Sequence, residues 1–142
     1  MIVIDANLLI YAYDTEAPDH IKSRAWVEDT FSGVDVVGLP WQSVSAFLRV
    51  ITNRRLPGLR LTLNQAVGIV EEWLEQPNVR LVVAGDDHWS LFRRMIVEGK
   101  APGPLVSDAE IAALTIEHAG VLHTADRDFA RFPGLRWVNP LS

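Results

Sequence analysis

The stretch MIVIDANLLIYAYD, residues 1–14, contains the pattern on which the rest of the chain is built. The apolar run 2–4 ends in a carboxylate, Asp5, and is typical of a short strand buried on both faces, as in parallel sheets. The segment that follows it, from Ala6 onward, predicts the start of a helix. These residues therefore predict a β-strand that passes directly into a helix.

The same alternation continues along the chain. Further strands are predicted at 35–40 (DVVGLP), 78–85 (NVRLVVAG), 121–125 (VLHTA) and, as a fifth, 135–140 (LRWVNP). Helices are predicted between them at 19–33, 41–53, 62–77, 86–99 and 107–120. The candidate N-caps are Asp19, Thr62 and either Ser107 or Asp108. This pattern predicts an α/β protein, a three-layer α/β/α domain with a central, mostly parallel sheet of four to five strands, and we expect residues 1–142 to form a single domain.

Composition excludes several classes of protein. Of the 142 residues, 49% are apolar and 22% charged, which excludes intrinsic disorder. The apolar runs are too short to span a membrane, and Met1 is followed by no basic leader or cleavage site, so a cytoplasmic protein without a membrane partner is expected. The chain has no cysteine, which excludes disulfides, thiol catalysis and cysteine-bound zinc.

Charge is unevenly distributed along the chain. The net charge is −5, yet no Asp or Glu occurs from Val36 to Val70. That window contains four arginines, Arg49, Arg54, Arg55 and Arg60. Two interpretations remain open: solvated surface arginines, or a basic face suited to a polyanion on an otherwise acidic protein.

Four aspartates are predicted to meet at one edge of the sheet. Asp5 closes the first strand, Asp126 and Asp128 follow the fourth, and Asp108 begins the helix that leads back to the fourth strand. In open parallel sheets, ligands bind outside the carboxyl ends of the strands. Each residue also has a purely structural interpretation: Asp108 as an N-cap, and Asp126 or Asp128 as a turn former.

Such a carboxylate group has a specific chemical use. Carboxylates in close proximity repel each other, and a divalent cation with a preference for oxygen ligands, Mg²⁺ or Mn²⁺ as a substitute, removes that cost. A cation held in this way activates water for attack on a phosphodiester. Asp5, Asp108 and Asp126 are therefore the candidate catalytic residues, and the same three together with Asp128 are the candidate metal ligands. The histidines show no zinc-type spacing.

Three segments together resemble a known family, the PIN domain. They are MIVIDANLLIYA, SDAEIAAL and HTADRDFARFPGLRWVNP. The similarity is closest to the toxin ribonucleases of VapBC toxin–antitoxin systems. The resemblance implies a Mg²⁺- or Mn²⁺-dependent toxin endoribonuclease that acts on RNA, forms a homodimer and is blocked by a cognate VapB-type antitoxin. In the family pattern, the acidic positions are matched by Asp5, Asp108, Asp126 and Asp128.

One position departs from the family pattern. The family has a glutamate in the helix after the second strand, and the matching residue here is Ala46. Three explanations are open. The first is a branch of the family that naturally lacks this glutamate, and the second is an engineered Glu→Ala change. The third is a catalytically weakened or inactive domain that binds RNA or protein. Glu110 is not expected to substitute, since it lies two residues from Asp108 and on a different side of the helix.

Two other families with a strand-ending aspartate fit poorly. Haloacid-dehalogenase-like phosphatases need a second aspartate two residues later, where this chain has Asn7. Receiver domains need a lysine late in the chain, and the only lysines are Lys22 and Lys100. The serious alternative to a nuclease is therefore the binding domain, and metal-dependent cleavage of RNA separates the two.

Overall fold

A computed structural model describes residues 1–142 and contains one five-stranded sheet with the strand order β3-β2-β1-β4-β5. Every neighbouring pair of strands is parallel. The strands are β1 (Ile2–Ile4), β2 (Val37–Pro40), β3 (Val79–Val82), β4 (Val121–His123) and β5 (Trp137–Val138). All five strands lie within the predicted segments, and the predicted parallel sheet is confirmed.

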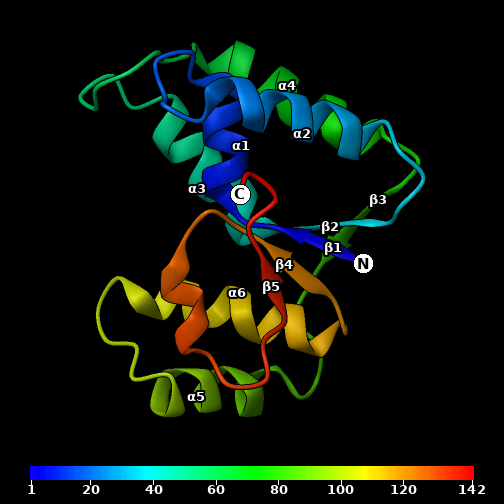
Figure 1. Ribbon diagram of the computed structural model, residues 1–142, viewed down its shortest axis with the longest axis vertical. Helices are drawn as coiled ribbons and strands as arrows, with labels where there is room; N and C mark the ends of the chain where they lie inside the picture. The colour runs from blue at the N-terminus through cyan, green and yellow to red at the C-terminus, as the bar shows by residue number, and fades with distance from the viewer.

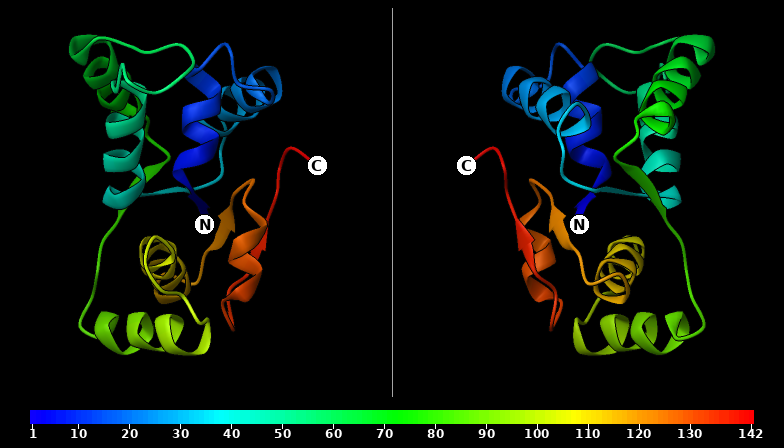
Figure 2. Two further views of the ribbon diagram at one scale, coloured as in Figure 1. Left: turned by 90° about the vertical axis from the view of Figure 1, so that its left-hand side faces the viewer. Right: turned by 90° about the vertical axis from the view of Figure 1, so that its right-hand side faces the viewer.

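Six α-helices cover the two faces of this sheet. They are α1 (Ala6–Tyr13), α2 (His20–Phe31), α3 (Trp41–Ile51), α4 (Leu63–Glu75), α5 (His88–Glu98) and α6 (Leu105–Glu117), and a short 3₁₀ helix, η1, spans Arg127–Arg131. Helices α1 to α4 lie on one side of the sheet and α5 and α6 on the other (Figures 1 and 2). The three-layer α/β/α architecture is thus confirmed. None of the helices combines the length and the apolar character needed to cross a membrane.

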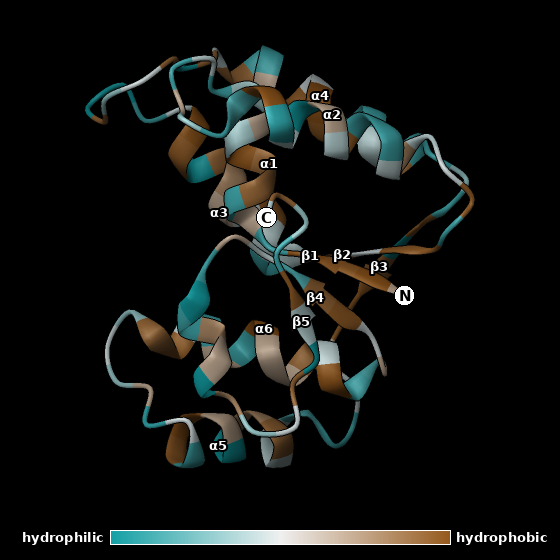
Figure 3. Cartoon of the chain, in the orientation of Figure 1, coloured by the Kyte–Doolittle hydropathy of each residue, from teal (hydrophilic) through white to brown (hydrophobic).

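Each face of the sheet has its own hydrophobic core, and β1 contributes to both. Ile4 packs into the core under α1 to α4, whereas Val3 packs into the core under α5 and α6. This division follows from the two-residue repeat of a strand, which sends successive side chains to opposite faces. Figure 3 shows the strands as a hydrophobic layer between the helices. Burial on both faces explains why the sequences of β1 and β2 are continuous apolar runs, whereas the edge strand β3 contains the exposed Arg80.

The helix starts were predicted with mixed success. Thr62 caps α4 as predicted, and it forms a reciprocal capping box with Gln65. Asp19 precedes α2, but its side chain makes no capping hydrogen bond. The prediction that Ser107 or Asp108 caps α6 is wrong, because this helix begins at Leu105 after Pro104. A proline fixes φ at a value that suits a helix start, so α6 extends further back and Asp108 lies in its first turn.

The loop 53–61 between α3 and α4 is fastened to the end of α1 by Asp14. One carboxylate oxygen of Asp14, Oδ1, accepts hydrogen bonds from the amides of Glu16 and Leu59, both at 3.0 Å. The other, Oδ2, lies 3.2 Å from Nη1 of Arg60, whose side chain is only 10% exposed. Gly58 has φ +101°, and a Cβ there would lie 2.5 Å from Asp14 Oδ2. The Asp14 anchor therefore holds the loop in place.

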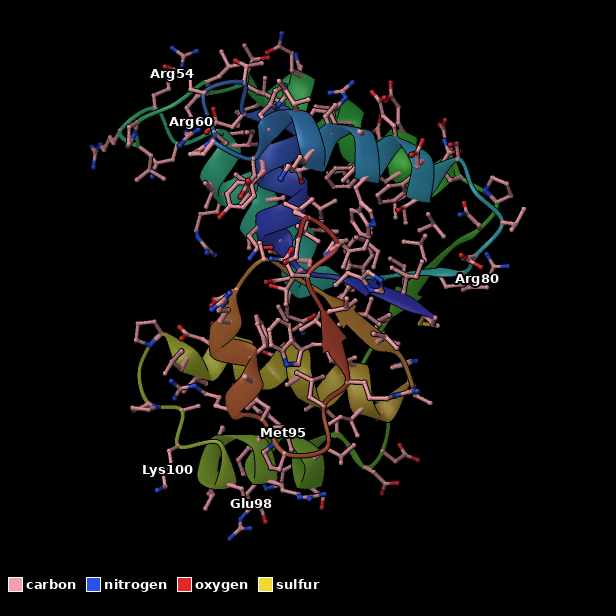
Figure 4. The ribbon with its side chains drawn as sticks, in the orientation of Figure 1. Arg54, Arg60, Arg80, Met95, Glu98 and Lys100 are labelled. Carbon is pink, nitrogen blue, oxygen red and sulfur yellow. The ribbon has the colours of Figure 1, made fainter.

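The same anchor determines which arginines of the acid-free segment 36–70 are free to bind a partner. Arg54 and Arg55 are exposed on the loop 53–61, whereas Arg60 is paired with Asp14. Figure 4 places Arg54 and Arg60 at the end of the molecule opposite Glu98 and Lys100. The structure thus removes Arg60 from the arginines that are free to contact a polyanion, and leaves Arg49, Arg54 and Arg55.

Candidate active site

Three of the four predicted aspartates line one pocket of about 640 Å³, next to the carboxyl ends of β1 and β4. They are Asp5, Asp108 and Asp126, from three distant parts of the sequence. As the side chains stand, no three acidic or histidine side chains are close enough together to share one ion. The predicted residues thus surround a common cavity rather than a single point, and side-chain rotation is needed for any shared ligand.

Asp5 is the most deeply placed of the three, with 8% of its surface exposed. It is the N-cap of α1, and its Oδ1 accepts a hydrogen bond of 2.8 Å from the amide of Ala6. Its Oδ2 accepts a hydrogen bond of 2.7 Å from the hydroxyl of Thr124. Burial raises the pKa of Asp5, the two hydrogen bonds lower it, and the charge of Asp126 raises it; the net direction is upward.

Thr124 links Asp5 to the segment that follows β4. This fully buried residue accepts hydrogen bonds at Oγ1 from the amide of Asp126 (3.0 Å) and from the side-chain amide of Asn7 (3.2 Å). Thr124 was not singled out from the sequence. It could have been found from the strand register, because Ile4 pairs with His123 and the next residue of each strand is then Asp5 and Thr124.

Asp126 and Asp128 occupy different environments. Asp126 is the N-cap of η1, and its Oδ1 accepts a hydrogen bond of 2.8 Å from the amide of Asp128. Asp126 is half-buried and lines the pocket, whereas Asp128 is exposed and is not among the lining residues. The assignment of Asp128 as an additional metal ligand stays a prediction.

Asp108 also has a raised pKa. Burial, followed by the charges of Asp5, Asp126 and Asp128, raises its pKa to about 6, and the charge of Arg131 opposes this. The four ion pairs of the structure involve none of the pocket's carboxylates. Their negative charge is therefore not compensated by any basic side chain of the protein at salt-bridge distance.

Helix α3 forms the opposite wall of the pocket. Its residues at helical spacing line the cavity: Trp41, Gln42, Ser45, Ala46 and Arg49. Ala46, which matches the family's glutamate, thus faces the pocket. A carboxylate at that position would have added to the group formed by Asp5, Asp108 and Asp126.

Glu110 also lines this pocket, so the expectation that it faces elsewhere is wrong. On a helix with 3.6 residues per turn, Asp108 and Glu110 lie on either side of Ser107, and the pocket is wide enough to include all three. Oε1 of Glu110 accepts a hydrogen bond of 2.7 Å from Nε2 of Gln42 on α3. Glu110 therefore supplies a fourth carboxylate from the α6 side and also bridges the two walls.

Known proteins match this chain over almost its whole length. The family model described as PIN domain matches residues 2–135. Ribonuclease VapC33 of Mycobacterium tuberculosis is 38% identical over 141 residues, which cover 99% of each chain. Ribonuclease VapC37 of the same organism is 36% identical over 140 residues, which cover 99% of this chain and 97% of the relative.

Solved structures share the fold at lower identity. VapC20 of Mycobacterium tuberculosis, a sarcin-ricin loop cleaving toxin, superposes with a TM-score of 0.66 at 20% identity and covers 96% of this chain and 99% of its own. VapBC2 of Rickettsia felis, bound to a DNA fragment from its promoter, gives a TM-score of 0.69 at 14% identity, with 98% of both chains covered. At these identities the likeness concerns the fold alone.

Proposed function

Because the chain belongs to the PIN domain family, we propose that it is the toxin endoribonuclease of a type II toxin–antitoxin module and hydrolyses phosphodiester bonds of RNA with the help of Mg²⁺ or Mn²⁺. The relatives at 38% and 36% identity are ribonucleases by name and match almost the whole chain. We take residues 1–142 as one domain with this activity, acting in the cytoplasm.

One observation carries this proposal: Asp5, Asp108, Asp126 and Glu110 line a single pocket and have no basic partner at salt-bridge distance. The raised pKa values of Asp5 and Asp108 reflect burial and mutual repulsion. An oxygen-only set of donors with uncompensated charge fits a hard divalent cation. Asp5, Asp108 and Asp126 would hold the ion, and Asp128 is the candidate for an additional ligand.

Such an ion supplies an activated water and stabilises the charge that develops on the phosphate. The remaining work falls to side chains of the protein. Thr124 fixes the rotamer of Asp5 through its hydroxyl and fixes the backbone of Asp126 through its oxygen. The amide of Ala6 holds the other oxygen of Asp5. Asp5 and the backbone of Asp126 are thereby held in place before the substrate arrives, which limits the rotation needed to the other carboxylates of the pocket.

We also propose a VapB-type antitoxin and a second copy of this chain as protein partners. Support for the antitoxin comes from structural neighbours that are themselves VapBC assemblies, such as the Rickettsia felis complex. A VapBC assembly from nontypeable Haemophilus influenzae shares the fold as well, with a TM-score of 0.69 and 18% identity over the whole of both chains. Co-expression with the neighbouring gene and size measurement of the purified complex test both partners.

The central test is cleavage of total cellular RNA by the purified protein, with and without Mg²⁺ or Mn²⁺, followed by mapping of the new ends. Metal-dependent cuts at defined positions are expected, and Asp5→Asn should abolish them while the protein stays folded. The matched control is Asp86→Asn, which changes an exposed aspartate outside the pocket. Cleavage that persists in the Asp5 variant or in the presence of a chelator would contradict the proposal.

The second candidate is an RNA- or protein-binding domain with weakened or lost catalysis. The observation in its favour is Ala46, which leaves the α3 wall without the family's glutamate. Glu110 favours the nuclease, because it brings another carboxylate into the same pocket. Tight RNA binding with no cut ends at any Mn²⁺ concentration would support the binding domain instead.

A further inference from the structure

We propose that α3 is the helix that recognises the RNA, with the indole of Trp41 stacked on an unpaired base and the guanidinium of Arg49 bound to a phosphate. Trp41 then contacts a base whose face is not covered by a neighbouring base. This inference rests on the proposed function and names the residues that select its substrate.

Trp41 is placed for stacking rather than for core packing. It is 45% exposed and lines the pocket beside the carboxylates, whereas Trp73 is 3% exposed and lies in the core. Trp26, Trp73 and Trp89 each pack against another ring. Trp41 and Trp137 have no aromatic partner, but Trp137 packs against the core under α5 and α6, whereas Trp41 borders the pocket. An exposed indole that borders a polar cavity offers a face on which any base can stack.

Arg49 is the only basic residue among those that line the pocket. It is exposed and takes part in none of the four ion pairs. The pocket's carboxylates repel a polyanion, so a phosphate is best accepted where Arg49 offsets them. The guanidinium presents several donors in a fixed plane that matches phosphate oxygens.

The two residues share one face of α3 through Gln42, Ser45 and Ala46, which also line the pocket. Arg49 follows Trp41 by eight positions, which corresponds to about 12 Å along a helix axis. The base contact and the phosphate contact therefore fall on different parts of the strand. In paired RNA the faces of the bases are covered by their neighbours, so stacking on Trp41 requires a base that is out of the helix.

The first experiment measures steady-state cleavage of a hairpin RNA that is cut in its loop, and of the same RNA after a complementary strand has closed the loop. The parent should cut only the open loop. Trp41→Ala should raise KM by roughly 5- to 150-fold, the range for loss of one base stack, with a smaller change in kcat, and Trp41→Phe should restore most of the affinity. Trp89→Ala is the control, because Trp89 is 65% exposed on α5 and outside the pocket.

The second experiment needs no catalysis. In chelator, binding of a short oligouridylate should quench tryptophan fluorescence in the parent and in Trp89→Phe, but not in Trp41→Phe. The salt dependence of binding should lose about one unit of log–log slope in Arg49→Ala. The exposed Arg93 on α5 provides the matched control, and Arg93→Ala should leave the slope unchanged.

These measurements separate the inference from the function on which it rests. If the parent cuts no RNA, the nuclease is wrong, and the fluorescence experiment still decides the role of Trp41. If the parent cuts RNA and Trp41→Ala has an unchanged KM, the stacking role is wrong. A Trp41 variant that loses only antitoxin affinity would assign this side chain to a protein contact and would also overturn the inference.

Discussion

The hydroxyl of Thr124 donates a hydrogen bond of 2.7 Å to Oδ2 of Asp5, across 119 positions of sequence. Thr124→Val keeps the shape of the side chain but removes this donor and the acceptor for the amide of Asp126. The variant should lose about 1–3 kcal/mol of unfolding free energy, because buried polar groups lose their partner. Mn²⁺ affinity should fall roughly 10- to 100-fold. Urea unfolding and calorimetry measure the two effects. Thr124→Ser retains the hydroxyl, so equal behaviour of the Val and Ser variants would rule out this role.

Asp108→Asn should make the metal-free protein more stable at pH 7. Because burial and neighbouring carboxylates raise the pKa of Asp108 to about 6, its ionisation at pH 7 opposes folding. Removal of that charge should add about 1 kcal/mol, after allowance for solvent screening of a half-buried group. Addition of Mn²⁺ should reverse the order, since only the parent keeps this ligand. Thermal unfolding in chelator and in Mn²⁺ measures both, with Asp86→Asn as the control that should show neither effect.

Ala46→Glu should tighten Mn²⁺ binding by roughly 10- to 100-fold, by analogy with outer-shell partners of metal sites, and should raise cleavage at low metal concentration. Position 46 faces the pocket, and glutamate is a good helix former. Calorimetric titration of Mn²⁺ into both forms provides the measurement. Gly68→Glu on α4 adds the same charge outside the pocket, at a position where a Cβ meets no other atom within 4 Å. If the Ala46 and Gly68 variants bind Mn²⁺ alike, a carboxylate at position 46 does not reach the ion.

Arg54 and Arg55 should contribute to RNA binding through charge alone. The double change Arg54→Ala and Arg55→Ala should reduce the log–log salt slope of RNA binding by up to about 2 units, if both side chains contact phosphate. Arg60→Ala should instead lower stability, because it removes the partner of Asp14. Filter binding over a range of salt concentrations and urea unfolding distinguish the two outcomes. An unchanged slope in the double variant would leave these arginines as solvated side chains or as antitoxin contacts.

Asp14 should make the protein sensitive to acid. Burial tends to raise its pKa, but hydrogen bonds from the amides of Leu59 and Glu16 and from Arg60 outweigh this, and the pKa is lowered from 3.8. A lowered pKa in the folded state gives stability that is present above pH 3.8 and is lost as the pH falls through the folded value. Asp14→Asn should therefore lose about 1–3 kcal/mol at pH 7 and less at pH 3. Urea unfolding at both pH values checks this, and an equal loss at both would contradict it.

The predictable parts of this molecule are those that depend on local pattern. Continuous apolar runs identified the strands, and Thr62 marked the start of α4, because these signals act within a few residues. The start of α6 was predicted too late, because Ser107 and Asp108 are typical N-cap residues. The helix begins at Leu105, since Pro104 already has a φ that suits a helix.

The site was predicted only in part, for a physical reason. Asp5, Asp108 and Asp126 could be proposed together because the carboxyl ends of parallel strands share one edge of a sheet. Thr124 becomes informative only once β1 is known to pair with β4, since that pairing sets it beside Asp5. Whether Glu110 and Trp41 line the pocket depends on how α3 and α6 face each other. The local sequence pattern does not predict how the two helices pack.

The contact between Asp5 and Thr124 also determines when during synthesis the pocket can exist. Asp5 is synthesised long before Thr124 and Asp126, and β4 must insert beside β1 before the three can meet. At about 5–20 residues per second, the nascent chain spends several seconds without Asp126, one of the proposed ligands. A growing chain therefore cannot form the complete pocket until β4 has been synthesised and has paired with β1.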